Sequence, residues 1–222
     1  LDRRRLAENE IEAHPGEHSP APWSGMVAPW QEAPSRWMAV KSKNLDFLEE
    51  VLGLRNAKRV SWGSGSLHLT HQTLLVSPPV DGWLLIVGPG LPDPSKDVDE
   101  CYRFVLKVSR AIGHVQFFSL NRALQHHAWV RAEGASIVRA YAWAGETVWN
   151  QGAMTHAERH LGMRCLSYGE IVEFDPHGGQ ATDNNVEKLF KLAALWSLDP
   201  SSLDQRRLSR SDGICGELAS LG

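Results

Sequence analysis

The sequence has neither a long apolar run nor an excess of one charge. A transmembrane helix needs about 20 consecutive apolar residues, and no run of even about 18 occurs. The 222 residues include 23 Lys and Arg against 26 Asp and Glu, a net charge of −3. Nucleic-acid-binding proteins usually carry a basic excess, so this balance argues against a nucleic-acid partner. Apolar residues at 42% and charged residues at 22% are typical of a globular protein and exclude a disordered or collagen-like chain.

Cysteine is scarce, and none of the three cysteines belongs to a C-x-x-C pair: Cys101, Cys165 and Cys215. A low and odd count is typical of free thiols in a reducing compartment, so a cytoplasmic or cytoplasm-facing location is favoured. The chain begins with a basic cluster, Leu1–Arg5, and not with Met. Basic clusters flank membrane anchors on the cytoplasmic side, so this segment fits either the residues after a missing N-terminal anchor or a trimmed end.

The motifs of nucleotide binding and of nucleophilic catalysis are also missing. The Gly88–Pro94 segment connects a strand to a helix, but Pro89, Pro92 and Pro94 have no N–H to offer a phosphate. No Gly-Lys-Ser/Thr sequence and no third glycine of the dinucleotide fingerprint follow. No G-x-S-x-G elbow is present either. We therefore expect no nucleotide and no cofactor, and favour a protein that is not an enzyme.

Three regions follow one another along the chain. Residues 1–35 are repeatedly interrupted by proline, which predicts an extended N-terminal arm that carries Trp23 and Trp30. Residues 36–200 alternate helical and strand patterns, and we expect them to form one domain. Residues 201–222 are expected to be a loosely ordered C-terminal tail.

Helices are predicted at 45–52, 94–112 and 186–196, where apolar residues recur at helical spacing. Asn44 and Asp93 are the expected N-caps of the first two, and Thr155 and Glu158 form a capping box that opens a short helix. Strand patterns occupy the following ranges: 35–40, 59–62, 67–77, 83–88, 114–120, 126–132, 137–144 and 147–150.

Short turns between strands favour antiparallel pairing. The predicted fold class is therefore α+β, an antiparallel sheet with helices packed on one face. A shift of 55 residues places Val60 on Val115 and Trp62 on Phe117, so two related α-β-β-β units are an alternative description of the same domain.

The most informative pattern lies in the hairpin between His127 and Trp143. Side chains alternate between the two faces of a strand, so small apolar residues point one way: Ala128, Val130, Ala132, Val138, Ala140, Ala142 and Ala144. Large aromatic and cationic residues point the other way: His127, Trp129, Arg131, Ile137, Arg139, Tyr141 and Trp143. Because Trp, Tyr and Arg dominate protein interfaces, all but Ile137 of this second set are the predicted binding residues. Alternatively, the Trp-bearing arm covers this face and the residues only pack.

Two segments carry residues that could ligate a metal ion. His156 and His160 stand four apart on a predicted helix, but the acid of H-E-x-x-H is missing because residue 157 is Ala. Asp175 and His177 alternate with Glu173 before a Gly-Gly pair, so an extended segment would point all three the same way. Both are weak candidates, and the sequence predicts no metal site.

These patterns favour a non-catalytic, bacterial-looking binding protein that docks a protein partner on the aromatic and cationic face, as an inhibitor, an immunity-type factor or an assembly factor would. One alternative is a hydrolase that uses histidine and carboxylate groups near Glu146, His156, His160 or Asp175. A second is a single-stranded nucleic-acid surface, on which Trp129 would stack bases and Arg131 would contact phosphates.

Overall fold

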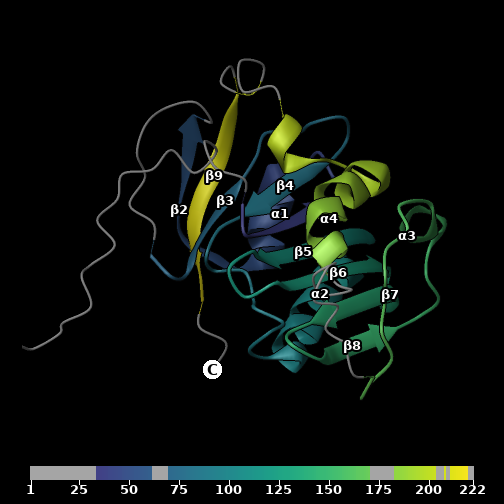
Figure 1. Cartoon of the computed structure of the whole chain (residues 1–222). Helices are drawn as coiled ribbons and strands as arrows, with labels where there is room; N and C mark the ends of the chain where they lie inside the picture. Colours follow the sequence, from purple (N-terminus) through teal and green to yellow (C-terminus); the bar gives the residue numbers. More distant parts are fainter. Residues whose placement is uncertain (1–33, 62–69, 171–182, 204–207, 209–210, 220–222) are drawn as a thin grey trace, which may run out of the picture.

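The computed structural model describes residues 34–61, 70–170, 183–203, 208 and 211–219. The predicted N-terminal arm, with Trp23 and Trp30, therefore lies outside the described residues. Within the described ranges, nine strands form a single sheet in the order β2-β9-β3-β4-β1-β5-β6-β7-β8, and every pairing between them is antiparallel (Figure 1). The predicted α+β class is confirmed.

The first five strands along the chain have these bounds: β1 Arg36–Val40, β2 Leu54–Ser61, β3 Thr73–Val76, β4 Leu84–Val87 and β5 His114–Asn121. The other four are β6 His126–Glu133, β7 Ser136–Trp143, β8 Thr147–Gln151 and β9 Asp212–Leu218. The helices are α1 Leu45–Leu52, α2 Val98–Ile112, α3 His156–His160 and α4 Asp183–Trp196, followed by the short 3-10 helix η1 Pro200–Ser202.

Local capping explains where the helices begin and end. As expected, the Asn44 side chain accepts from the Phe47 N–H at the start of α1. Gly53 ends this helix in the left-handed conformation. Thr155 and Glu158 form the expected capping box of α3. The prediction for α2 was wrong by one turn: its N-cap is Asp97, whereas Asp93 belongs to the preceding loop.

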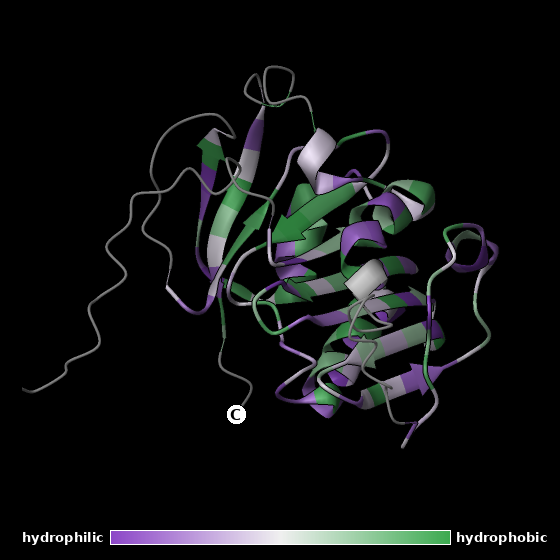
Figure 2. Cartoon of the chain, viewed as in Figure 1, coloured by the Kyte–Doolittle hydropathy of each residue, from purple (hydrophilic) through white to green (hydrophobic). Residues whose placement is uncertain are grey.

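Helices cover both faces of the sheet, not the single face that was expected. On one face, α1 and α2 bury Leu48 and Val105 against a core that includes Met38 and Phe117. On the opposite face, α4 buries residues such as Leu189 against a second core that is rich in aromatic rings. Figure 2 shows apolar colour along the central strands, which are covered on both sides.

The C-terminal segment departs most from expectation. Residues 212–218, predicted to be loosely ordered, form β9 and pair with β2 on one side and with β3 on the other. Both α-β-β-β runs occur in chain order, as α1-β2-β3-β4 and α2-β5-β6-β7. In space the first run is interrupted, because β9 lies between β2 and β3.

Candidate functional site

The predicted aromatic and cationic face is part of the interior. Trp129 and Tyr141 are 0% exposed, and His127, Arg139 and Trp143 are buried as well. The expectation that this face is open to solvent was therefore wrong. It packs against residues of α4 and against two residues that follow α3, Met163 and Leu166.

A β-bulge also changes which residues share that face. The register shifts between Arg131 and Ala132, so Ile137 pairs with Ala132 and packs into the core under α1 and α2. Val138, assigned to the small apolar set, is 43% exposed. A bulge adds one residue to one strand, so simple alternation misplaces the residues that precede it in β7.

Arg139 is fully buried because a buried polar cluster satisfies its guanidinium. Its Nε donates to Glu158 Oε1 at 2.7 Å, and its Nη1 donates to Asn150 Oδ1 at 2.8 Å. Glu158 also accepts from Trp129 Nε1 at 2.8 Å and from the backbone N–H of Thr155 at 2.6 Å. A buried ion pair is tolerated only when its remaining donors and acceptors find partners, and here they do. We call Arg139, Glu158, Trp129, Asn150 and Cys165 the buried polar cluster.

Cys165 in this cluster is not an activated nucleophile. Arg139 Nη2 donates to its Sγ at 3.0 Å. Burial nevertheless raises the pKa of the Cys165 thiol to about 12, and the nearby Arg139 only partly offsets that effect. Burial also raises the pKa of Cys101 and of Cys215. A thiol that stays protonated at neutral pH is a poor nucleophile, so the three free cysteines have a packing role.

The candidate metal ligands do not form a centre in the described part of the chain. His156 and His160 are exposed on α3, and their rings stack with centroids 6.2 Å apart. No group of three or more His, Cys, Asp or Glu within the described residues could hold a metal ion. Glu173, Asp175 and His177 lie outside those residues.

The glycines of the Gly88–Pro94 segment allow a close approach to β3. A Cβ on Gly88, which has φ +138°, would lie 2.3 Å from the Thr73 carbonyl oxygen. A Cβ on Gly90 would lie 2.5 Å from the Gln72 carbonyl oxygen. Both positions need glycine because the backbone of Gln72 and Thr73 passes directly beside them. Phosphate binding is not needed to explain these glycines.

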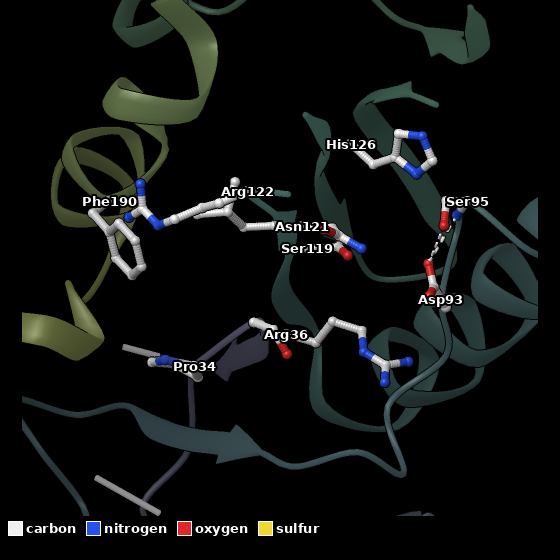
Figure 3. Close-up of a pocket in the computed structure, with 11 residues that line it drawn as sticks. Pro34, Arg36, Asp93, Ser95, Ser119, Asn121, Arg122, His126 and Phe190 are labelled. Carbon is white, nitrogen blue, oxygen red and sulfur yellow. Dashed lines mark hydrogen bonds between the residues drawn. The ribbon is translucent and has the colours of Figure 1, made fainter. Parts of the chain in front are cut away.

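A polar cleft opens beside this loop, at the end of the sheet where β1 begins and β5 ends. Its volume is about 450 Å³, and we call it the cleft. Its polar lining consists chiefly of Arg36, Asp93, Ser119, Asn121, Arg122 and His126 (Figure 3). The strand register gathers these residues, because Arg36 pairs with Ser119 across β1 and β5, and Asn121 pairs with His126 across β5 and β6.

Several cleft side chains are held in place by contacts with the backbone. Arg36 donates from Nη1 to the Leu91 carbonyl at 2.5 Å and from Nη2 to the Pro89 carbonyl at 3.3 Å. Asn121 Oδ1 accepts from the Leu124 N–H at 3.1 Å, so its amide NH2 is left for other partners. Polar groups with fixed positions are preorganised for a ligand.

Other polar groups of the cleft are unsatisfied within the described part of the chain. His126 Nδ1 is buried and has no hydrogen-bond partner there. Ser119 is 9% exposed, and its hydroxyl has no hydrogen-bond partner among the described residues. Buried polar groups are nearly always hydrogen-bonded, so such groups on the wall of a cavity point to a missing partner.

None of the six cleft residues was a predicted binding residue. Arg36, Ser119 and Asn121 are ordinary strand-end residues in the sequence. The signal that could have found them is the pairing of β1 with β5, which brings Arg36 to Ser119 across 83 positions of sequence. Only the topology reveals that pairing.

Comparison of the chain with protein-family models, curated proteins and solved structures finds no match in any of the three. Within the described residues, none of the helices has both the length and the hydropathy to span a membrane. The assignment of a function therefore rests on the geometry of the cleft.

Proposed function

We propose that this protein is a non-catalytic binding protein that holds a small anionic ligand in the cleft. The observation that carries the proposal is the charge of the lining. Two guanidinium groups, of Arg36 and Arg122, and the His126 ring line the same cavity with one carboxylate, that of Asp93. Neither arginine forms an ion pair within the described residues.

The size and the donors of the cleft suit such a ligand. A volume of about 450 Å³ falls within the roughly 300–1,000 Å³ typical of small-molecule sites. Arginine donates several N–H groups in a fixed, planar arrangement that matches carboxylate and phosphate oxygens. The Ser119 hydroxyl and the Asn121 amide add neutral donors from the neighbouring strand.

The contacts in the cleft favour binding over hydrolysis. A nucleophile and its base stand within about 2.6–3.2 Å of each other in most active sites. No hydrogen bond joins Ser119 to His126 among the described residues, and the Asp93 carboxylate accepts from Ser95 and not from a histidine. The alternative hydrolase hypothesis thus lacks a nucleophile–base pair in the cleft.

The cleft replaces the aromatic face as the proposed binding site. A protein partner could reach Trp129 and Tyr141 only if α4 and the segment after α3 moved away. The same burial removes the support for a single-stranded nucleic-acid surface, which needs exposed rings for base stacking.

The test is ligand-dependent stabilisation measured by thermal unfolding, with the dicarboxylate glutarate as the probe. A ligand that binds only the folded state raises the melting temperature with concentration. We expect this rise for the wild type and for Arg110→Gln, which removes an exposed arginine of α2 outside the cleft. The rise should be lost or strongly reduced in Arg122→Gln. An equal rise in all three proteins would refute the proposal, and so would the absence of a rise in the wild type with both glutarate and glutamate.

A further inference from the structure

The cleft contains two opposite charges that are not paired with each other. Arg36 and Asp93 both line it, yet no ion pair joins them. Arg36 is held by the carbonyls of Pro89 and Leu91. Asp93 Oδ1 accepts from the backbone N–H of Ser95 at 3.0 Å and from its hydroxyl at 2.7 Å. Asp93 Oδ2 accepts no hydrogen bond from any described residue. Each charge is thus fixed by its own neighbours and keeps capacity for a ligand.

The second arginine lies at the other end of the cleft. Figure 3 shows Arg36, Asp93 and His126 on one side, whereas the Arg122 side chain extends toward Phe190 on the other. The Arg122 guanidinium carbon lies 5.8 Å from the centre of the Phe190 ring. The cleft therefore presents a cation and an anion at one end and a second cation at the other.

We propose that the ligand is a dicarboxylic amino acid of the aspartate or glutamate class. The α-carboxylate would accept from Arg36, the ammonium group would donate to Asp93, and the side-chain carboxylate would pair with Arg122. This assignment matches every charge of the cleft with an opposite charge of the ligand, which is the basis of electrostatic specificity. The inference rests on the proposed function, since it specifies which anion the cleft binds.

A simple dicarboxylate fits the cleft less well, because the Asp93 carboxylate would then face a second negative charge. An amino acid with a neutral side chain would leave Arg122 without a partner. Both comparisons can be made with ligands that differ from glutamate by one group: glutarate lacks the ammonium group, and glutamine has an amide in place of the side-chain carboxylate.

The experiment is isothermal titration calorimetry of the full chain with glutamate, glutarate and glutamine. For the wild type we expect glutamate to bind about tenfold or more tightly than either analogue, which is the scale of one charged contact. Asp93→Asn should weaken glutamate and tighten glutarate, because it removes both an attraction and a repulsion. The asparagine oxygen can still accept from Ser95, so the loop should keep its structure. Arg122→Gln should abolish the preference for glutamate over glutamine.

Asp99→Asn, which neutralises an exposed carboxylate of α2, is the matched control and should leave all three affinities unchanged. If wild type binds glutarate as tightly as glutamate, or if Asp93→Asn changes both affinities in the same direction, the amino-acid assignment is wrong and the anion-binding proposal stands. If none of the three ligands binds wild type, both proposals fail.

Discussion

The buried polar cluster and the cleft contain the same kinds of residue, but only in the buried polar cluster does the fold itself satisfy their polar groups. In the buried polar cluster, Arg139 and Glu158 are fully buried, and their polar atoms are satisfied from within the fold. In the cleft, Arg36 and Asp93 are held in position but not paired, and His126 Nδ1 has no partner among the described residues. A saturated polar network specifies a structure, whereas an incompletely satisfied one leaves room for a ligand.

This contrast explains why residue type alone is a poor guide to the site. The β6–β7 hairpin carries Trp, Tyr and Arg, which are the residues of an interface, but it uses them for packing. Trp129 and Tyr141 are 4.9 Å apart between ring centres, and Trp129 also donates to Glu158. Whether such residues bind a partner depends on what covers them.

The largest effect is expected when the buried ion pair is broken. Arg139→Met should lower the free energy of unfolding by about 3–5 kcal/mol, because Glu158 keeps a buried charge without its cation. Arg131→Met is the matched control: Arg131 lies directly across from Arg139, but its pair with Glu133 is partly exposed. We expect a loss below about 1 kcal/mol for the control. Urea unfolding of both variants measures the difference.

The double variant Arg139→Met/Glu158→Leu sharpens that test. Replacing a buried ion pair by apolar groups is often neutral, so the double variant should recover a large part of the stability lost in Arg139→Met. A double variant as unstable as the sum of its single changes would mean that the pair is not the main reason for the loss. Glu158→Leu also removes the acceptor of Trp129 Nε1, so full recovery is not expected.

A smaller effect tests whether α4 is a permanent cover of the aromatic face. Leu189 is 0% exposed, and Leu189→Ala should cost about 3 kcal/mol, which is typical of a buried leucine. Leu195→Ala, on an exposed position of the same helix, should change stability by less than about 0.5 kcal/mol. Equal and small losses would show that α4 is loosely attached, and a protein partner could then reach the aromatic face.

Much of the fold was predictable because its signals are local. The Asn44 cap, the Gly53 terminator and the Thr155 capping box each depend on residues a few positions apart. The strands after α2 follow one another as antiparallel neighbours, so β5 to β8 have the expected order. The uninterrupted apolar residues of β3 and β4 are a further local signal, typical of strands that are buried on both faces.

The errors came from long-range pairing and from the bulge. β9 is a short strand that belongs to the sheet through its pairing with β2 and β3, both of which are far from it in the sequence. No local signal shows that α4 covers Trp129 or that the Arg131/Ala132 bulge turns Ile137 to the other face. The cleft was missed for the same reason, since Arg36 and Ser119 meet only through the pairing of β1 with β5.

A modest pH effect is expected from His114, at the start of β5 and far from the cleft. Burial, reinforced by Arg131, lowers the pKa of His114, although Glu133 acts in the opposite direction. The folded protein therefore favours the neutral His114 ring. As the pH falls, this histidine takes up a proton at a higher pH in the unfolded chain than in the folded protein. The free energy of unfolding should fall as the pH drops below the ordinary histidine value of about 6.5. Urea unfolding at several pH values should show a smaller fall in His114→Gln than in wild type and in the exposed control His156→Gln.

The smallest effect on stability is expected in the cleft itself. Ser119→Ala and Arg122→Gln remove groups that have no hydrogen-bond or ion-pair partner among the described residues, so each should change the free energy of unfolding by less than about 0.5 kcal/mol. Arg122 contacts the Phe190 ring, but the contact is at the surface and contributes little. Urea unfolding without ligand measures this directly. A loss above about 1 kcal/mol in either variant would place that residue with the buried polar cluster, as part of the scaffold, and would weaken the assignment of the cleft as a ligand site.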